Sequence, residues 1–261
     1  MHPVRRPAVA GLFYPANPLE LRETVTAFLQ TAIGTEPAPK AIIAPHAGYV
    51  YSGAIAASAY ALLAPVREQI HRVVLLGPSH RVGFYGLAVP SVDLFATPLG
   101  DVPIDRAAID LISTLPGVCV MDQAHALEHS LEVHLPFLQI ALADFKIVPI
   151  VVGDADASTV AKVIDALWGG DETLIVVSSD LSHYHDYQTA RALDQATSEA
   201  IETLRPEQLD YESACGRNPV AGLLTVAKQR GLHAKTIDLR NSGDTSGPRN
   251  QVVGYGAYVF H

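Results

Sequence analysis

The sequence is poor in cysteine, and this scarcity excludes one class of protein. Cys119 and Cys215 are the two cysteines among 261 residues, too few for the disulfide framework that holds small secreted domains together. Unpaired thiols are typical of a reducing compartment, so we expect a cytoplasmic protein. Cys119 lies inside a β-like run and is expected to be a small buried hydrophobic residue.

Positive charge and long apolar runs are also scarce. The chain has 18 basic and 27 acidic residues, a net charge of −9, which disfavours nucleic acid and anionic membranes as major partners. No run reaches the ~20 apolar residues of a membrane span, and the N-terminus has no signal-peptide pattern. The chain also lacks the G-x-S-x-G, G-x-G-x-x-G and P-loop motifs, which disfavours the enzyme classes built on them.

Apolar, β-branched runs alternate with helical patterns along the chain. The expected strands are Ala41–Ala44, Arg72–Leu76, Leu87–Val92, Val118–Met121, Lys146–Val152, Thr173–Val177, Ala234–Leu239 and Gly254–Phe260. The expected helices are Leu19–Ile33, capped by Asn17 and Pro18, then Ser52–Leu63, Asp105–Leu115, Ser130–Leu142, Ala157–Leu167, Thr189–Leu204 and Val220–Arg230. This alternation predicts a single-domain α/β/α sandwich over residues 1–261, with a central, largely parallel, mixed sheet.

Histidines follow three of the expected strands at their carboxyl ends. His46 ends the first strand in "IIAPH", His80 follows the second in "LLGPSH", and Asp180 and His183 follow a third in "VVSSDLSH". A single histidine at a strand end is more often a packed loop residue than a ligand. Three at one edge of a sheet favour a shared site instead, because ligands bind at the carboxyl ends of the strands in open α/β sheets and imidazole is the commonest metal ligand.

A second cluster of acidic residues and histidines lies in "HALEHSLEVHLP". Its spacing does not match the H-E-x-x-H zinc helix. Glu128, His129 and His134 are interpreted either as residues that support or line the site, or as part of the helix expected from Ser130.

Cys215 lies in "ACGRNPV", at a tight turn before a helix that we expect to start at Pro219. A thiolate at such a turn can meet a cation or the positive end of the helix. We therefore expect a lowered pKa for Cys215 and interpret it as a soft metal ligand.

Several segments together resemble the Memo family, the middle member of the AmmeMemoRadiSam set. They are "RRPAVAGLFYP", "IIAPHAGYVYSG", "LLGPSH", "EHSLEVHLPFLQ", "VVSSDLSH", "ACGRNPV" and "NSGDTSG" followed by "VVGYGAY". The matches run in order along nearly the whole chain. The family is similar in fold to class III extradiol ring-cleaving dioxygenases, which hold non-haem iron(II) by two histidines and a glutamate.

This resemblance implies a set of site residues. His46 and His80 match the two metal histidines, and His183 matches the acid/base histidine. Cys215 stands where the dioxygenases have the carboxylate, and Asp180 belongs to the same site, where it either orients His183 or approaches the metal. The implied cofactor is iron(II), with copper or zinc as alternatives, because a thiolate is a softer ligand than a carboxylate.

Three functions remain open from the sequence. The first is a non-haem metal oxidoreductase linked to O2. The second is a zinc-type hydrolase, and the third is a metal-binding or peptide-binding scaffold without catalysis. The expected partners are a small molecule or peptide in the pocket, and the resemblance also suggests a functional association with radical SAM and AMMECR-type proteins.

Overall fold

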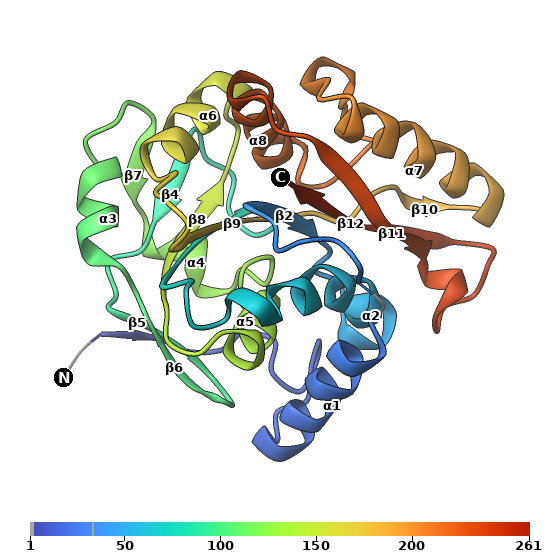
Figure 1. The fold of residues 1–261 in the computed structure, drawn as a ribbon, viewed down its shortest axis with the longest axis horizontal. Helices are drawn as coiled ribbons and strands as arrows, with labels where there is room; N and C mark the ends of the chain where they lie inside the picture. Colours follow the sequence, from blue (N-terminus) through green and yellow to red (C-terminus); the bar gives the residue numbers. More distant parts are fainter. Residues whose placement is uncertain (1–2, 33) are drawn as a thin grey trace.

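The computed structural model describes residues 3–32 and 34–261 and has a mixed α/β architecture (Figure 1). The strands are β1 (Val4–Arg5), β2 (Ala41–Ala44), β3 (Arg72–Pro78), β4 (Leu87–Val89), β5 (Leu94–Thr97), β6 (Gly100–Pro103), β7 (Val118–Val120), β8 (Lys146–Val152), β9 (Thr173–Ser178), β10 (His183–His185), β11 (Ala234–Asn241) and β12 (Val252–Phe260). The α-helices are α1 (Pro18–Thr31), α2 (Tyr49–Tyr60), α3 (Arg106–Ile112), α4 (Asp122–Ala126), α5 (Leu135–Ala141), α6 (Ala157–Ala166), α7 (Tyr187–Glu202) and α8 (Arg217–Arg230). Short 3-10 helices are η1 (Ala61–Val66), η2 (Glu132–His134), η3 (Pro206–Gln208) and η4 (Ser242–Asp244).

The large sheet is mixed, with a parallel centre. Its strand order in the described part of the chain is β10-β12-β2-β9-β3-β8-β4-β7, and β11 also pairs with β12. The four central strands, β2, β9, β3 and β8, are mutually parallel, whereas β12 and β4 run antiparallel to their neighbours β2 and β8. The expected largely parallel, mixed sheet is confirmed. The carboxyl ends of β2, β9 and β3 therefore lie side by side at one edge.

Helices cover both faces of this sheet. In Figure 1, α6, α7 and α8 lie above the sheet and α1, α2 and α5 lie below it. The strands between them are fully buried along most of their length, including all four residues of β2 and all six of β9. The α/β/α sandwich expected from the sequence is thus confirmed, and its rigid centre carries the loops described below.

All eight expected strands are present, but several helix boundaries differ. The helix expected over Ser130–Leu142 was wrong in its first half, where the chain forms a turn and η2 before α5 begins at Leu135. The helix expected from Pro219 begins at Arg217. The start of α1 is as expected, since the Asn17 side chain accepts hydrogen bonds from the amides of Leu19 and Glu20; its expected end at Ile33 lies outside the described residues.

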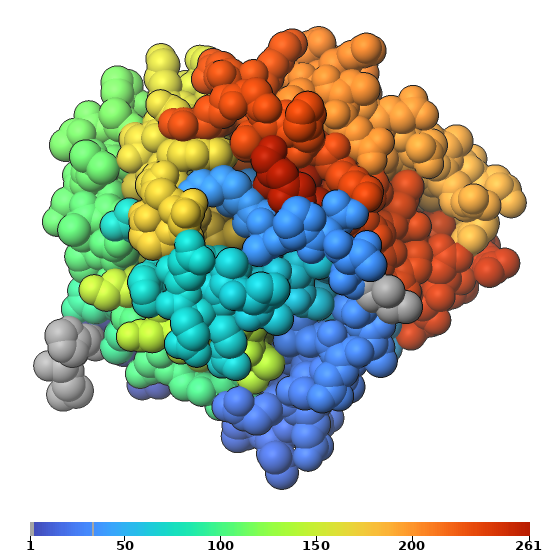
Figure 2. Space-filling view, in the orientation of Figure 1, coloured from blue at the N-terminus to red at the C-terminus, as the bar shows by residue number. Residues whose placement is uncertain are grey.

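The helical stretch Tyr49–Val66 corrects the expectation that no segment is apolar enough to cross a membrane. It has 18 residues and a mean hydropathy of 1.3, but 56% of it is buried inside the protein. This stretch, α2 followed by η1, packs against β2, β11 and β12. Figure 2 shows the chain around it in blue and cyan, in contact with the red C-terminal part of the molecule. Its apolar character is therefore explained by the core that it helps to build.

A buried carboxylate fixes the N-terminal segment to the rest of the fold. Glu132, on η2, is fully buried and pairs with the guanidinium of Arg5. It also accepts hydrogen bonds from the amides of Ala8 (2.8 Å) and Val9 (3.0 Å) and from the hydroxyl of Tyr14 (2.5 Å). Four donors on one carboxylate satisfy its acceptor capacity, so the charge is buried without an unpaired partner.

A buried histidine makes the stability of the fold sensitive to acid. His125 is 2% exposed, its Nε2 donates to the carbonyl of Ala88 at 2.9 Å, and burial lowers its pKa to about 4. In the unfolded chain its pKa returns to about 6.5, so its contribution is complete above that pH and is lost as the pH falls toward 4. Between pH 7 and pH 5 we expect a loss of about 2 kcal/mol from this residue.

Urea denaturation of the wild type and of His125→Gln at both pH values measures this loss. Between pH 7 and pH 5, the free energy of unfolding of the wild type should fall by about 2 kcal/mol more than that of the variant. His71→Gln, at an exposed position, serves as the control and should keep the wild-type difference. Equal losses in the wild type and in His125→Gln would contradict the assignment.

Candidate metal centre

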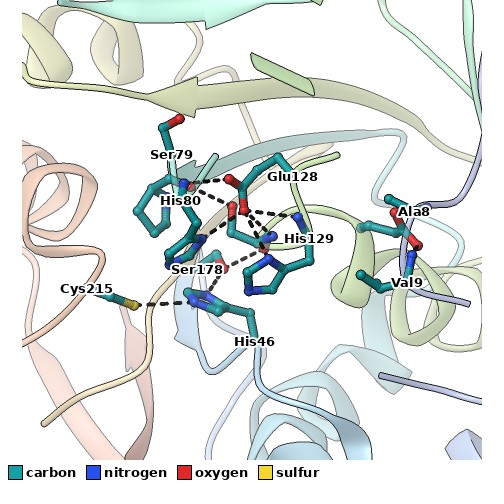
Figure 3. A network of polar contacts seen from close by, with 12 residues as sticks. Ala8, Val9, His46, Ser79, His80, Glu128, His129, Ser178 and Cys215 are labelled. Atoms are coloured by element: carbon teal, nitrogen blue, oxygen red, sulfur yellow. Dashed lines mark hydrogen bonds and ion pairs between the residues drawn. The ribbon is translucent and has the colours of Figure 1, made fainter. Parts of the chain in front are cut away.

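Three loops that follow neighbouring parallel strands bring their side chains together. Pro45 and His46 follow β2, Ser79 and His80 follow β3, and Asp180 lies just beyond β9. Because β2, β9 and β3 are adjacent and parallel, these residues meet at one edge of the sheet. Figure 3 shows the rings of His46 and His80 facing a common space, with ring centroids 5.1 Å apart.

Cys215 reaches the same space from the turn before α8. The amide of Asp180 donates to its Sγ (3.3 Å), and its own amide donates to the Asp180 carbonyl (3.3 Å). The next residue has to be glycine, because a Cβ on Gly216 would lie 2.5 Å from the Ser178 carbonyl oxygen. The loop after β9 and the turn before α8 are therefore in close contact, and this contact sets the position of the sulfur.

The expected lowering of the Cys215 pKa was wrong for the metal-free protein. Burial, together with the nearby carboxylate of Asp180, raises the pKa of the thiol. These effects outweigh the helix N-terminus and the hydrogen bonds from backbone amides. The sulfur is therefore a thiol in the absence of a cation, and it lies 3.3 Å from Nε2 of His46 as a donor to that nitrogen.

The hydrogen bonds around His46 leave its Nε2 without a proton. The hydroxyl of Ser178 donates to the carbonyl of Ser130 at 2.6 Å, so its oxygen acts as an acceptor for Nδ1–H of His46, also at 2.6 Å. Burial and the neighbouring histidines lower the pKa of His46 well below its usual value. His46 is therefore a neutral imidazole whose Nε2 lone pair faces the sulfur of Cys215.

Glu128 holds Nδ1 of His80 in a similar way. Its carboxylate accepts from Nδ1 of His80 (2.9 Å) and from the His80 backbone amide (2.6 Å). Burial alone would raise the pKa of Glu128, but the hydrogen bonds and charge of His80 lower it to about 2, so the carboxylate is ionised. A carboxylate on one ring nitrogen fixes the tautomer and makes the other nitrogen more basic, the arrangement commonly found around metal-bound histidines.

The donor atoms form two overlapping groups that each have the spacing of a metal site. The ligand atoms of His46, His80 and Cys215 lie within 4.8 Å of one another, and so do those of His80, Glu128 and His129. In the second group, however, Glu128 also accepts hydrogen bonds from the amides of His129 and Ser130. The first group offers two imidazole rings and a thiol, so its chemistry suits a cation better.

His129 and His134 border the site in different ways. The ring of His129 stacks on that of His80 at 4.6 Å, and burial lowers its pKa to about 4. His134 is fully buried behind the site, where its Nδ1 is hydrogen-bonded to the hydroxyl of Tyr60 (2.8 Å) and burial lowers its pKa to about 3. His129 thus lies against a ligand ring, whereas His134 belongs to the packing behind the ligands.

Asp180 and His183 lie beside the site. In the described part of the chain, no hydrogen bond joins their side chains. Asp180 accepts from the amide of His46 (2.7 Å), and burial raises its pKa to about 6. Nδ1 of His183 donates to the carbonyl of Leu181 (2.7 Å), so its Nε2 is the basic nitrogen. The next residue, Tyr184, has φ of 62°, an uncommon conformation for a tyrosine that the β-bulge in β10 maintains.

The donor set fits a first-row transition metal. Two imidazoles and a cysteine sulfur are ligands that iron, copper and zinc accept, whereas magnesium and calcium prefer oxygen ligands. The structure brings together the three residues that the sequence predicts as ligands, and their binding of a metal stays a prediction. Sequence reasoning missed Ser178, at the end of β9, and the backbone carbonyl of Ser130, in the turn before η2, whose hydrogen bonds set the His46 tautomer, because neither position carries a sequence pattern of its own.

Comparisons with known proteins identify the family of the chain. A family model described as "Memo-like protein" matches residues 5–259. Proteins named "MEMO1 family protein" from Aquifex aeolicus and Archaeoglobus fulgidus are 39% and 37% identical to the chain, and each match covers 98% of this chain and 99% of the relative.

A solved structure supports the fold alone. An uncharacterized protein from Escherichia coli K12 superposes with a TM-score of 0.50 at 13% identity, over 84% of this chain and 98% of that one. The sequence relatives, in contrast, extend over nearly the full length at more than a third identity. The chain therefore belongs to the Memo family.

Proposed function

We propose that this chain is a metal-dependent protein that holds one iron(II) ion through His46, His80 and Cys215 and takes part in an O2-linked redox reaction. The observation that carries the proposal is the convergence of His46, His80 and Cys215, with Nδ1 of each histidine held by a hydrogen bond so that Nε2 is the nitrogen left to face a cation. Iron(II) held by three protein ligands keeps open positions and supplies the electrons for a reaction with O2. Copper and zinc are the alternatives that the same ligands accept.

Two further residues are proposed to handle protons. Nε2 of His183 is available as a base because Nδ1–H is held by the Leu181 carbonyl. Burial raises the pKa of Asp180 above the usual range of a carboxyl group, which favours a role in proton transfer. Its hydrogen bond to the amide of His46 also fixes the loop that carries this ligand.

The thiolate gives the proposal its sharpest spectroscopic test. If Cys215 binds the metal, copper(II) or iron(III) bound to the wild type should give a sulfur-to-metal charge-transfer band, and Cys215→Ser should erase it. Cys119→Ser is the matched control and should keep the band, because Cys119 lies on β7 at the far side of the sheet order from β2. A band that persists in Cys215→Ser would remove the sulfur from the ligand set.

The choice between functions depends on the metal found in the natural protein. Elemental analysis after anaerobic purification from the native host measures it directly. Iron or copper supports the redox function, zinc at full occupancy supports a hydrolase, and the absence of any metal supports a scaffold. Cys215→Glu, which restores two histidines and one carboxylate, should retain iron(II) without the band.

A further inference from the structure

Arg217 carries a positive charge without a carboxylate partner. Within residues 3–32 and 34–261, its guanidinium makes no ion pair or hydrogen bond, and its Cζ lies 3.4 Å from the ring centroid of Tyr211. Stacking on an aromatic face holds the guanidinium in place but leaves its in-plane N–H donors free. Arg217 is also half-buried, where an unpaired cation is less well solvated than on an open surface. Its position therefore favours an anionic partner.

Arg217 lines a cleft that also reaches Cys215, one of the candidate metal ligands. This cleft has a volume of about 560 Å³ and is lined by both Cys215 and Arg217, a size suited to a small organic molecule. Its walls include Val82 and Phe84, and Tyr85 lines it while remaining 85% exposed. The cleft thus combines a cation, apolar walls and exposed aromatic rings beside the proposed metal centre.

The remaining polar groups limit the charge of a ligand. Asp154 also lines the cleft and is exposed, so a second negative charge on the ligand would be repelled. Asn218 is already engaged, since its Nδ2 donates to the Gly153 carbonyl at 3.0 Å. That bond ties the start of α8 to the loop after β8 and holds two sides of the cleft together. Arg217 can pair with one negative charge, and Asp154 disfavours a second, so the cleft suits a ligand with a single negative charge.

We propose that this cleft binds a small organic monocarboxylate with an aromatic or apolar body. Its carboxylate pairs with Arg217, its body packs against Phe84 and the rings of Tyr85 and Tyr211, and its other end reaches Cys215. The inference rests on the proposed function, because it takes the cleft to be the place where the substrate of the metal centre binds. It adds the chemical class of that substrate.

Calorimetric titration with benzoate, benzamide and phenyl phosphate tests this inference. Each probe is titrated into metal-loaded protein and into protein freed of metal with a chelator. Benzoate should bind to both forms, because its carboxylate needs Arg217 and not the metal. Arg217→Gln should weaken benzoate binding by about 10-fold or more, the usual effect of losing a charged hydrogen bond. Arg191→Gln, the same change at an exposed arginine on α7, should leave it unchanged.

The outcomes separate this inference from the proposed function. If the wild type binds no metal but benzoate binding still depends on Arg217, the proposed function fails and the carboxylate site stands. If benzoate does not bind, or binds equally to the wild type and to Arg217→Gln, the inference is overturned whatever metal is present. Tighter binding of phenyl phosphate than of benzoate would overturn the monocarboxylate class, and benzamide binding as well as benzoate would overturn the role of the charge.

Discussion

Replacement of His80 by alanine is expected to abolish stoichiometric metal binding while the protein stays folded. His80 supplies one of the two imidazole rings of the proposed site, and its side chain is 28% exposed, so its loss leaves little buried space unfilled. The loss of one of three protein ligands should weaken iron(II) affinity by more than the 10- to 100-fold that supporting residues typically contribute. Anaerobic dialysis followed by elemental analysis measures the metal, and circular dichroism checks the fold.

Graded variants make this result specific to the site. Glu128→Gln keeps a hydrogen-bond acceptor near His80 but removes the charge, so it should weaken metal binding by about 10- to 100-fold, less than His80→Ala. His71→Ala, at an exposed position outside the site, should bind like the wild type. His46→Ala should also lose the metal, but His46 is 2% exposed, so this variant loses stability as well. If His80→Ala binds the metal with wild-type affinity, His80 is not a ligand.

Replacement of Glu132 by glutamine is expected to destabilise the fold by about 3–5 kcal/mol, the usual cost of breaking a buried ion pair on one side. Glu132 is fully buried and holds Arg5, two backbone amides and the hydroxyl of Tyr14. The amide group of glutamine would place N–H donors against these donors and leave the charge of Arg5 without a partner. Urea denaturation at pH 7 measures the free energy of unfolding.

A surface glutamate provides the matched control for this substitution. Glu68 pairs with Arg67, but its side chain is 80% exposed, so Glu68→Gln should change the stability by at most about 0.5 kcal/mol. A loss below about 1 kcal/mol in Glu132→Gln would mean that the network contributes no more than an exposed ion pair.

The sequence predicts the sheet well because its strands follow from local patterns, and it predicts that His46, His80 and Cys215 meet; their role as metal ligands stays a prediction. Continuous apolar runs define β2, β3 and β9. Because these strands are parallel, residues that follow their carboxyl ends all lie at the same edge of the sheet. Cys215 was identified from its turn, although its expected pKa was wrong. The local sequence indicates the turn, but the pKa of Cys215 is raised by burial and by the charge of Asp180, which lies in a loop 35 residues away in the chain.

The segment from Glu128 to Glu132 shows why other features resist prediction. Both glutamates fit one helix by spacing, yet the backbone there is a turn and the two carboxylates serve different parts of the molecule. Glu128 holds His80, and Glu132 holds Arg5, 127 residues away in the chain. Partners so distant leave no trace in local periodicity, and the helix predicted from Ser130 was wrong in the part before Leu135.

Crystals of anaerobically purified protein, with an anomalous difference map at the absorption edge of the bound metal, test the central claim most directly. The account predicts one peak per chain, about 2.0–2.3 Å from Nε2 of His46, Nε2 of His80 and Sγ of Cys215, the range of metal–imidazole and metal–thiolate bonds. A peak bonded to Glu128 and His129 instead of His46 and Cys215, or no peak after addition of iron(II), copper or zinc, would contradict it.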